Sequence, residues 1–267
     1  MSTPSAPPRR ISVEQIARAA REIDPVFLHS RDVASDALGR RCNAQVVLKD
    51  ETANPIRSFK GRGADFFIRT LSTLPPRVVC ASAGNFGQGL AYAAVRRGIA
   101  CDVFAATTAN PLKIDRMRAL GAKVQLAGVD FDAAKDAARE YAESMAAPFI
   151  EDGREVAISE GAGSIGVELT TGHQTLDVVV VPLGNGALLG GIATWVKHVS
   201  PTTRVLGVCA AGADAMERSW RARSFISTAE ARTIADGIAV RVPIPEAVDD
   251  LQGVVDDILL VSDDEIL

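Results

Sequence analysis

The chain has 267 residues, of which 47% are hydrophobic and 23% are charged, and its formal net charge is −4. This length and composition suffice for a substantial core, arranged as one large domain or as two smaller ones. The small negative charge lacks the basic footprint expected of proteins that bind nucleic acid or an anionic membrane, so we expect neither partner.

Four cysteines are scattered along the chain without a C-x-x-C pair or a histidine at metal-binding spacing. This pattern is typical of a reduced intracellular protein rather than of a disulfide framework or a zinc site. Met1–Arg10 carries two arginines and lacks the apolar stretch of a secretory signal, and no apolar run reaches membrane-spanning length. We therefore expect a cytoplasmic protein.

The chain before residue 50 predicts two helices and a strand. Ser12–Gln15 forms a capping-box pattern that opens a helix through Ile23. A second helix is expected from Arg31 to Leu38, closed by Gly39. Gln45–Lys49 is rich in valine and is typical of a strand.

A turn with a single lysine follows that strand, in Asn54–Gly63. Pro55 restricts its own backbone and biases Asn54 toward extended conformations, so the strand must stop and turn. Ser58 is expected to cap a helix that opens at Phe59 and Lys60. The partial positive charge of a helix N-terminus favours a neutral lysine amine, the form that Schiff-base chemistry needs. Taken alone, a lysine here is more often an ordinary surface residue.

From Pro75 onward, short apolar strands alternate with helices, which indicates a parallel α/β sheet with helices on both faces. Expected strands are 77–81, 101–105, 123–126, 177–181, 204–209 and 254–261. Expected helices are 90–97, 112–120, 131–145 and 189–199, besides one through Phe66 and Ile68.

Three turns are therefore expected at the carboxyl ends of strands, where ligands bind in open α/β sheets. The Lys60 turn offers an amine, and Ser82–Gln88 offers backbone N–H groups at a helix N-terminus, which suit a carboxylate. Gly184–Gly191 can cradle a phosphate, although it matches neither nucleotide-binding glycine motif and could serve only close helix packing. Together, the turns suit a cofactor that carries an aldehyde and a phosphate and acts on an amino acid.

Four motifs resemble, in order, the threonine/serine dehydratase group of the fold-type II pyridoxal phosphate (PLP) enzymes. They are Ser58–Lys60 with Arg62–Ala64, Ser82–Gly89, the glycine loop after Pro182, and Ala235–Val240. The resemblance covers most of the chain and implies a two-lobed α/β enzyme with parallel-rich twisted sheets. The larger, PLP-binding lobe would comprise residues 1–57 and 157–267, and the smaller lobe would comprise residues 58–156.

The resemblance also implies the chemistry. Pyridoxal 5'-phosphate would be the cofactor, and threonine or serine would be dehydrated and deaminated to a 2-oxo acid and ammonia. Lys60 would form the Schiff base and move the proton of the substrate's α-carbon, Phe59 would pack on the cofactor ring, and Asn85 would bond the ring hydroxyl. The substrate carboxylate would lie along Ser82, Ala83, Gly84, Asn85 and Gln88, and the phosphate would be surrounded by Gly184, Asn185, Gly186, Ala187 and Leu188. A homodimer is expected.

The chain departs from the group's pattern at several positions. Ala187 replaces the fourth glycine of the phosphate loop and does not easily adopt a left-handed φ, so the loop could be shaped differently. Ala83 stands where the group's racemases carry a second serine, so racemisation is not expected. Cys209–Ala211 stands where some relatives have an acidic metal ligand, so we expect no metal.

Other functions stay open. Gly184-Asn185 is also similar to threonine synthase, so β-replacement or threonine-synthase-like chemistry is an alternative. The segment that in relatives gives a Ser, Thr or Cys to the pyridine nitrogen would lie beyond Leu267. The chain is therefore expected to be a fragment or to lack that partner, and a catalytically impaired amino-acid- or PLP-binding descendant is a third hypothesis.

Overall fold

A computed structural model describes residues 9–173 and 175–267, and the chain divides into two compact units. Unit 1 comprises the residues up to Ala19 with Ala162–Leu267, and unit 2 comprises Ala20–Gly161. The lobes expected from the sequence were 1–57 with 157–267, and 58–156. Residues 20–57 group instead with unit 2, to which they are tied by polar contacts such as the 2.8 Å hydrogen bond from the Asp24 N–H to Asp65.

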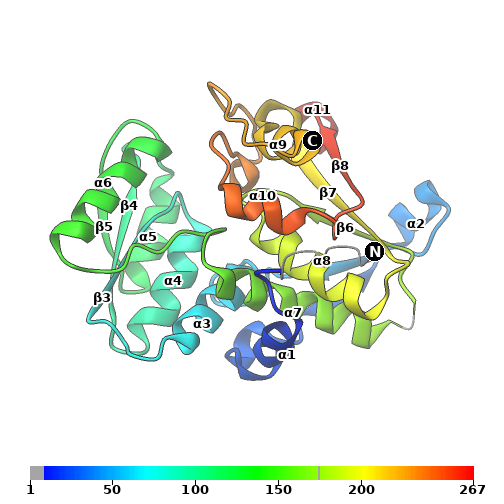
Figure 1. Ribbon diagram of the computed structural model, residues 1–267, viewed down its shortest axis with the longest axis horizontal. Helices are drawn as coiled ribbons and strands as arrows, with labels where there is room; N and C mark the ends of the chain where they lie inside the picture. Colours follow the sequence, from blue (N-terminus) through cyan, green and yellow to red (C-terminus); the bar gives the residue numbers. More distant parts are fainter. Residues whose placement is uncertain (1–8, 174) are drawn as a thin grey trace, which may run out of the picture. The chain divides into compact units, whose positions relative to one another are not determined.

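Unit 2 contains a parallel sheet in the order β3-β4-β5 (Figure 1). Its strands are β3 (Arg77–Ala81), β4 (Ala100–Ala105) and β5 (Lys123–Leu126), and its helices are α3 (Lys60–Thr70), α4 (Asn85–Val95), α5 (Pro111–Ala119) and α6 (Phe131–Ser144). Phe104 packs in one cluster with Ala138 and Ala142 of α6. A Cβ added at Gly87 of α4 would instead meet Val103. Because adjacent strand residues point to opposite faces, α6 covers one face of the sheet and α4 the other.

An antiparallel pair, β1 (Arg31–Ala34) and β2 (Val47–Asp50), precedes this sheet, with α2 (Asp36–Cys42) between the strands. The predicted helix over 31–38 is therefore wrong. Arg31 and Asp32 form ion pairs across the strands with Asp50 and Lys49, at 2.6 and 3.0 Å. The pairing of β1 with β2 thus overrides the helical pattern, and the helix begins only after Ser35, whose hydroxyl accepts the Leu38 N–H.

Unit 1 contains the second parallel sheet, in the order β6-β7-β8. Its strands are β6 (Val178–Pro182), β7 (Arg204–Ala210) and β8 (Asp257–Val261), and its helices are α8 (Ala187–Val199), α9 (Ala215–Ala222), α10 (Pro245–Leu251) and α11 (Asp263–Ile266). Two helices, α1 (Val13–Glu22) and α7 (Val156–Gly172), cross the boundary between the units. Short 3-10 turns lie at Pro25–Phe27, Ala211–Ala213 and Asp236–Ile238.

The predicted α/β fold with parallel strands and helices on both faces is confirmed. The three candidate turns, which the sequence places after strands, follow strands of three different sheets. The Lys60 turn follows β2 of the antiparallel pair, the Ser82 turn follows β3, and the glycine loop follows β6. The apolar strands are alike in sequence, so the sequence could not say which of them hydrogen-bond to each other.

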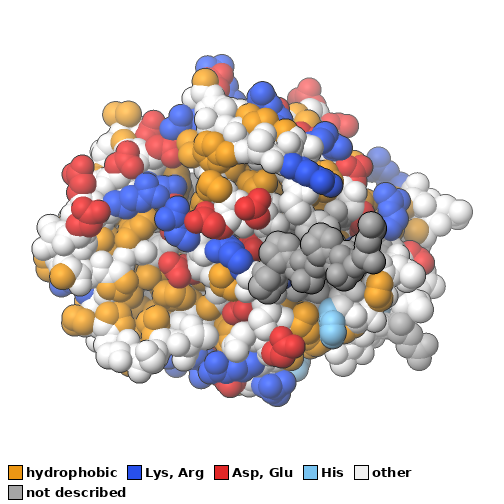
Figure 2. All heavy atoms as spheres, in the orientation of Figure 1, with side chains coloured by type: hydrophobic (Ala, Val, Ile, Leu, Met, Phe, Trp, Pro, Cys, Tyr) orange, Lys and Arg blue, Asp and Glu red, His pale blue; other side chains and the backbone are white. Residues whose placement is uncertain are grey.

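The surface carries charges of both signs. Figure 2 shows lysine and arginine side chains interspersed with aspartate and glutamate on the face in view. Among the described residues, no helix combines the length and the apolar character needed to cross a bilayer. The expectation about a secretory signal concerns Met1–Arg10, of which residues 1–8 lie outside the described part of the chain.

Candidate functional site

The turn between β2 and α3 is fixed by its own side chains. Asp50 accepts hydrogen bonds from the N–H and the hydroxyl of Thr52, at 2.9 and 2.5 Å. The Asn54 amide donates to the carbonyl oxygens of Glu51 (2.8 Å) and Ser58 (3.1 Å). These bonds tie both ends of the turn together, so the backbone that leads into Lys60 has little freedom.

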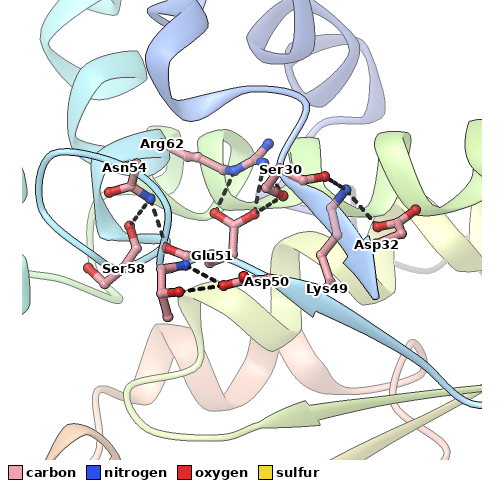
Figure 3. A network of polar contacts seen from close by, with 9 residues as sticks. Ser30, Asp32, Lys49, Asp50, Glu51, Asn54, Ser58 and Arg62 are labelled. Carbon is pink, nitrogen blue, oxygen red and sulfur yellow. Dashed lines mark hydrogen bonds and ion pairs between the residues drawn. The ribbon is translucent and has the colours of Figure 1, made fainter. Parts of the chain in front are cut away.

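Arg62 anchors the first turn of α3 to β2. Its side chain is 0% exposed, and its guanidinium donates to both carboxylate oxygens of Glu51 at 2.9 and 2.8 Å. A further bond of 3.0 Å reaches the Ser30 hydroxyl, and the Lys49 amine donates to the Ser30 carbonyl at 2.7 Å. Figure 3 shows these side chains together: Ser30 lies just before β1, Lys49 on β2, Glu51 just after β2 and Arg62 on α3. A paired, hydrogen-bonded arginine is the form in which a guanidinium tolerates such burial.

Lys60 is the first residue of α3, and only 15% of its side chain is exposed. Its Nζ forms an ion pair with the Asp152 carboxylate and lies 4.7 Å from the centre of the Phe59 ring. The sequence-based expectation of a neutral amine considered only the helix N-terminus and did not include this carboxylate partner, so the charge state of Lys60 stays a prediction.

Ser58 does not cap the helix, so that prediction is wrong. Phe59 occupies the N-cap position with an almost helical backbone, at φ −64° and ψ −17°, and its carbonyl accepts the Arg62 N–H. Ser58 lies one residue before this N-cap, and no side-chain cap hydrogen bond forms at the start of α3. The Ser58 hydroxyl oxygen is buried and has no hydrogen-bond partner among the described residues.

Asp152 reaches Lys60 through an extra strand-like segment beside β3. Phe149 bridges Val79 in parallel, and the Ile150 N–H donates to the Val79 carbonyl at 2.7 Å. The chain after this bridge therefore emerges at the carboxyl edge of β3. The Asp152 side chain is 9% exposed, and its Oδ1 is buried with no hydrogen-bond partner in the described part of the chain.

The Ser82 turn follows β3 directly. The Ser82 hydroxyl oxygen accepts the N–H groups of Gly84 (3.1 Å) and Gly87 (2.8 Å), so this serine caps the start of α4. Ser82, Gly84 and Gln88 are buried, whereas Ala83 and Asn85 are exposed. A Cβ at Gly84 would lie 2.6 Å from Cδ of Lys113, so the Lys113 side chain packs closely against this turn. The turn therefore presents a helix N-terminus with one exposed amide side chain, Asn85.

The glycine loop of unit 1 leads from β6 into α8. Gly186 is the N-cap of α8 and has a φ of +92°, a conformation that suits glycine. Ala187 is already the first helical residue, and it is not among the described non-glycine residues with a positive φ. The sequence suggested that Ala187 could change the shape of the loop, because alanine does not easily adopt a left-handed φ. The residue with the left-handed φ is instead Gly186, so Ala187 imposes no such change.

The segment with the fourth motif, Ala235–Val240, packs against this loop within unit 1. A Cβ at Gly184 would lie 3.1 Å from the Gly237 carbonyl oxygen and 3.3 Å from the Ile238 Cα. The backbone of the loop therefore approaches a neighbouring backbone too closely for a side chain at residue 184. The first N–H groups of α8 have no partners within the helix, so the loop can accept an anionic group such as a phosphate.

Two observations test whether these residues fit an aldehyde-bearing phosphate cofactor. In unit 2, a largely buried lysine amine lies beside the carboxylate of Asp152, one oxygen of which has no donor among the residues that the structure describes. In unit 1, a loop without side chains at Gly184 and Gly186 precedes a helix of 13 residues. Both suit the group. Within residues 9–173 and 175–267, no cluster of three or more His, Cys, Asp or Glu side chains could hold a metal ion.

Comparison with known proteins gives the family. Residues 30–267 match the sequence pattern of the family described as pyridoxal-phosphate dependent enzyme. The chain belongs to this family. A catabolic L-threonine dehydratase of Staphylococcus aureus is 32% identical over 259 residues, which are 96% of this chain and 75% of that protein. The predicted membership of the threonine/serine dehydratase group and the predicted cofactor are confirmed.

Two further proteins that this chain resembles are also named threonine dehydratase or threonine deaminase. A biosynthetic L-threonine dehydratase of Pasteurella multocida is 36% identical over 231 residues, but the matched part spans only 45% of its length. The processed form of threonine deaminase isoform 2 from Solanum lycopersicum has a TM-score of 0.88 at 29% identity. The match covers 98% of this chain and 80% of that structure, so the two-sheet architecture is shared.

Proposed function

We propose that this PLP-dependent enzyme is a lyase that dehydrates and deaminates a small β-hydroxy amino acid, threonine or serine, to a 2-oxo acid and ammonia. The observation that carries the proposal is the Lys60 amine, largely buried and held at the start of α3 by the Arg62–Glu51 network. The threonine dehydratases named above support this choice of substrate. The PLP group, when bound, supplies an electron sink for the charge left at Cα after proton removal.

The residues of unit 2 would do the proton chemistry and the orientation. Lys60 would hold the cofactor through Nζ and, once released, would take the proton from the substrate's Cα. The N–H groups at the start of α4, together with Ser82 and Gln88, would bind the substrate carboxylate. Holding the carboxylate fixes the direction of the Cα–H bond, and orientation of this kind is a large part of enzymatic rate enhancement.

Phe59 and Asn85 would contact the cofactor ring and its hydroxyl group. The loop Gly184–Leu188 of unit 1 would bind the phosphate through backbone N–H groups at the start of α8, where the helix dipole favours negative charge. We further propose that the protein acts in the cytoplasm as a homodimer and accepts serine as well as threonine. Its free cysteines, three of them buried, agree with a reducing compartment.

A visible absorption spectrum and an amino-acid panel test the proposal. Purified protein incubated with PLP should show a visible absorption band that changes on addition of threonine or serine, with release of a 2-oxo acid. Lys60→Ala should lose both the band and the lyase activity. Lys135→Ala is the matched control, because Lys135 also pairs with a carboxylate, Glu151, at 13% side-chain exposure.

Retained turnover in Lys60→Ala would reject the assignment of this lysine. Product analysis with an added nucleophile separates the lyase from a β-replacement enzyme, since only the latter incorporates the nucleophile. A band that responds to amino acids without any product would indicate the amino-acid-binding descendant instead.

A further inference from the structure

We propose that Asp152 is the counter-ion and proton-exchange partner of Lys60, and therefore a second acid–base residue of this site. In this role the Asp152 carboxylate favours a positively charged Lys60 nitrogen, both in the cofactor-free chain and after the nitrogen has bonded to the cofactor. The second half of the inference rests on the proposed function, because it takes Lys60 as the lysine that holds the cofactor.

The first argument is the contact itself. Asp152 and Lys60 are separated by 92 positions in the sequence, yet the Asp152 carboxylate pairs directly with Nζ. Both side chains are largely shielded from water, at 9% and 15% exposure. In such surroundings an opposite charge favours the charged form of its partner much more strongly than it does at the surface.

The second argument is the free oxygen of the same carboxylate. Asp152 Oδ1 is buried and has no hydrogen-bond partner among the described residues. A carboxylate oxygen without a donor can accept a further hydrogen bond, so Asp152 Oδ1 offers an acceptor to a bound ligand. An incoming amino acid brings an ammonium group to the lysine, and this group can donate to Oδ1. The ligand class indicated is therefore an amine-bearing one.

The other titratable groups near the pair do not replace Asp152. Glu151, its neighbour in sequence, is engaged by Lys135 at 2.5 Å and by Arg139 at 3.1 Å. Burial raises the pKa of the Cys80 thiol on β3, with smaller contributions from the charges of Asp102 and Asp152, so Cys80 stays neutral. Lys113 of α5 lies with its aliphatic chain against Gly84, and Arg154 pairs with Glu151.

The formation of a bond between Lys60 and the cofactor requires a group that accepts and returns a proton, and Asp152 is placed to do this. The Lys60 nitrogen has to be neutral to bond to the aldehyde carbon of the cofactor, so Asp152 would accept the proton that the ammonium gives up. Asp152 would return this proton to the nitrogen once it is bonded to the cofactor. Between the two side chains only a proton moves, so no oxidant or reductant is needed.

The test measures the pH dependence of the cofactor's visible band in Asp152→Asn, which keeps the shape and removes the charge. Loss of an adjacent opposite charge should lower the pH midpoint of the band by about one to three units. Glu151→Gln is the matched control: it removes one charge from the next residue, which is 7% exposed against 8% for Asp152. The pH midpoint of the band in Glu151→Gln should equal that of the wild type. In Asp152→Glu the midpoint should return most of the way to the wild-type value.

A second measurement uses the cofactor-free chain. Lysines are reductively methylated with a carbon-13 label, and the Lys60 signal is assigned by its absence in Lys60→Arg. Its titration midpoint should be lower in Asp152→Asn than in the wild type and in Glu151→Gln. Equal midpoints would overturn the inference. If the wild type shows no visible band, the proposed function fails, and this titration still decides whether Asp152 is the counter-ion of Lys60.

Discussion

Replacing Arg62 by methionine should destabilise unit 2 strongly. Arg62 is fully buried and makes two bonds to the Glu51 carboxylate and one to the Ser30 hydroxyl. Methionine fills part of the space left by the arginine but offers no donor. Glu51, whose side chain is 14% exposed, would then keep its negative charge without its cationic partner.

Removing one partner of a buried ion pair costs about 3–5 kcal/mol, because the other charge stays behind. The partial exposure of Glu51 lets some water reach the carboxylate, which places the expected loss near the lower end, at about 3 kcal/mol. With a urea m-value of about 2 kcal/mol/M, the unfolding midpoint should fall by about 1.5 M. Replacing both residues, as Arg62→Met with Glu51→Leu, removes the orphaned charge and should recover at least half of this loss.

Urea unfolding followed by far-UV circular dichroism measures these changes, and tryptophan fluorescence, from Trp195 and Trp220, follows unit 1 separately. Arg69→Met is the matched control on the same helix. Its partner Asp65 keeps the ion pair with Arg97 at 2.9 Å, so the control should lose less than about 1 kcal/mol. If Arg62→Met is no less stable than Arg69→Met, the buried pair does not anchor α3 as argued here.

Two further predictions concern stability. Burial raises the pKa of Glu151, but the hydrogen bond and charge of Lys135 and the charges of two arginines outweigh it, so the pKa lies below its ordinary value of 4.5. The ionised Glu151 carboxylate therefore stabilises the folded chain fully above pH 4.5, and this stabilisation is lost as the pH falls through the folded-state pKa. In urea unfolding at stepped pH, the free energy of unfolding should therefore fall less on acidification in Glu151→Gln than in the wild type. Gly161→Ala should cost about 1–3 kcal/mol, because its Cβ would lie 2.7 Å from the Arg62 carbonyl oxygen and the Gly63 Cα. At Gly237 an added Cβ would meet no atom within 4 Å other than those of its chain neighbours, so Gly237→Ala should stay within about 0.5 kcal/mol in the same assay. Equal losses in the two variants would refute the close approach of α7 to α3.

Strands between clear turn residues were the most predictable part of the fold. β3 and β5 have the predicted bounds: β3 is a mostly apolar, buried run, and in β5 the apolar Val124 and Leu126 alternate with Lys123 and Gln125. The predicted helix at 31–38 failed because the deciding interaction is the pairing of β1 with β2, which lies beyond the range of local patterns. Only a possible helix start at Glu160–Ser164 could be read from the sequence of α7, because Gly161, Gly163 and Gly166 interrupt the helical pattern. These glycines let neighbouring backbones approach closely and so have a packing purpose.

The candidate site, like the fold, has a part that could be predicted from local sequence and a part that depends on long-range contacts. Lys60, Ser82 and the glycine loop lie in motifs of recognisable residue types, so the sequence could single them out, although their roles stay predictions. Asp152 lies in no such motif. Its position depends on the parallel bridge between Phe149 and Val79, a long-range backbone contact. The only local signal was the adjacent acidic pair Glu151-Asp152 after a short apolar run, and acidic pairs are common on surfaces.

Within unit 2, the Lys60 amine is constrained from two sides. Its backbone is fixed by the Arg62–Glu51 pair, which joins α3 to the strand before the turn. Its Nζ is held by Asp152, which follows the segment that bridges β3 at Val79 and comes 92 positions later in the chain. The first constraint involves no reacting atom, whereas the second touches the nitrogen itself. Substitutions in the Arg62 network should therefore lower the free energy of unfolding, and Asp152→Asn should change the proton affinity of the amine, which makes the two roles separable by experiment.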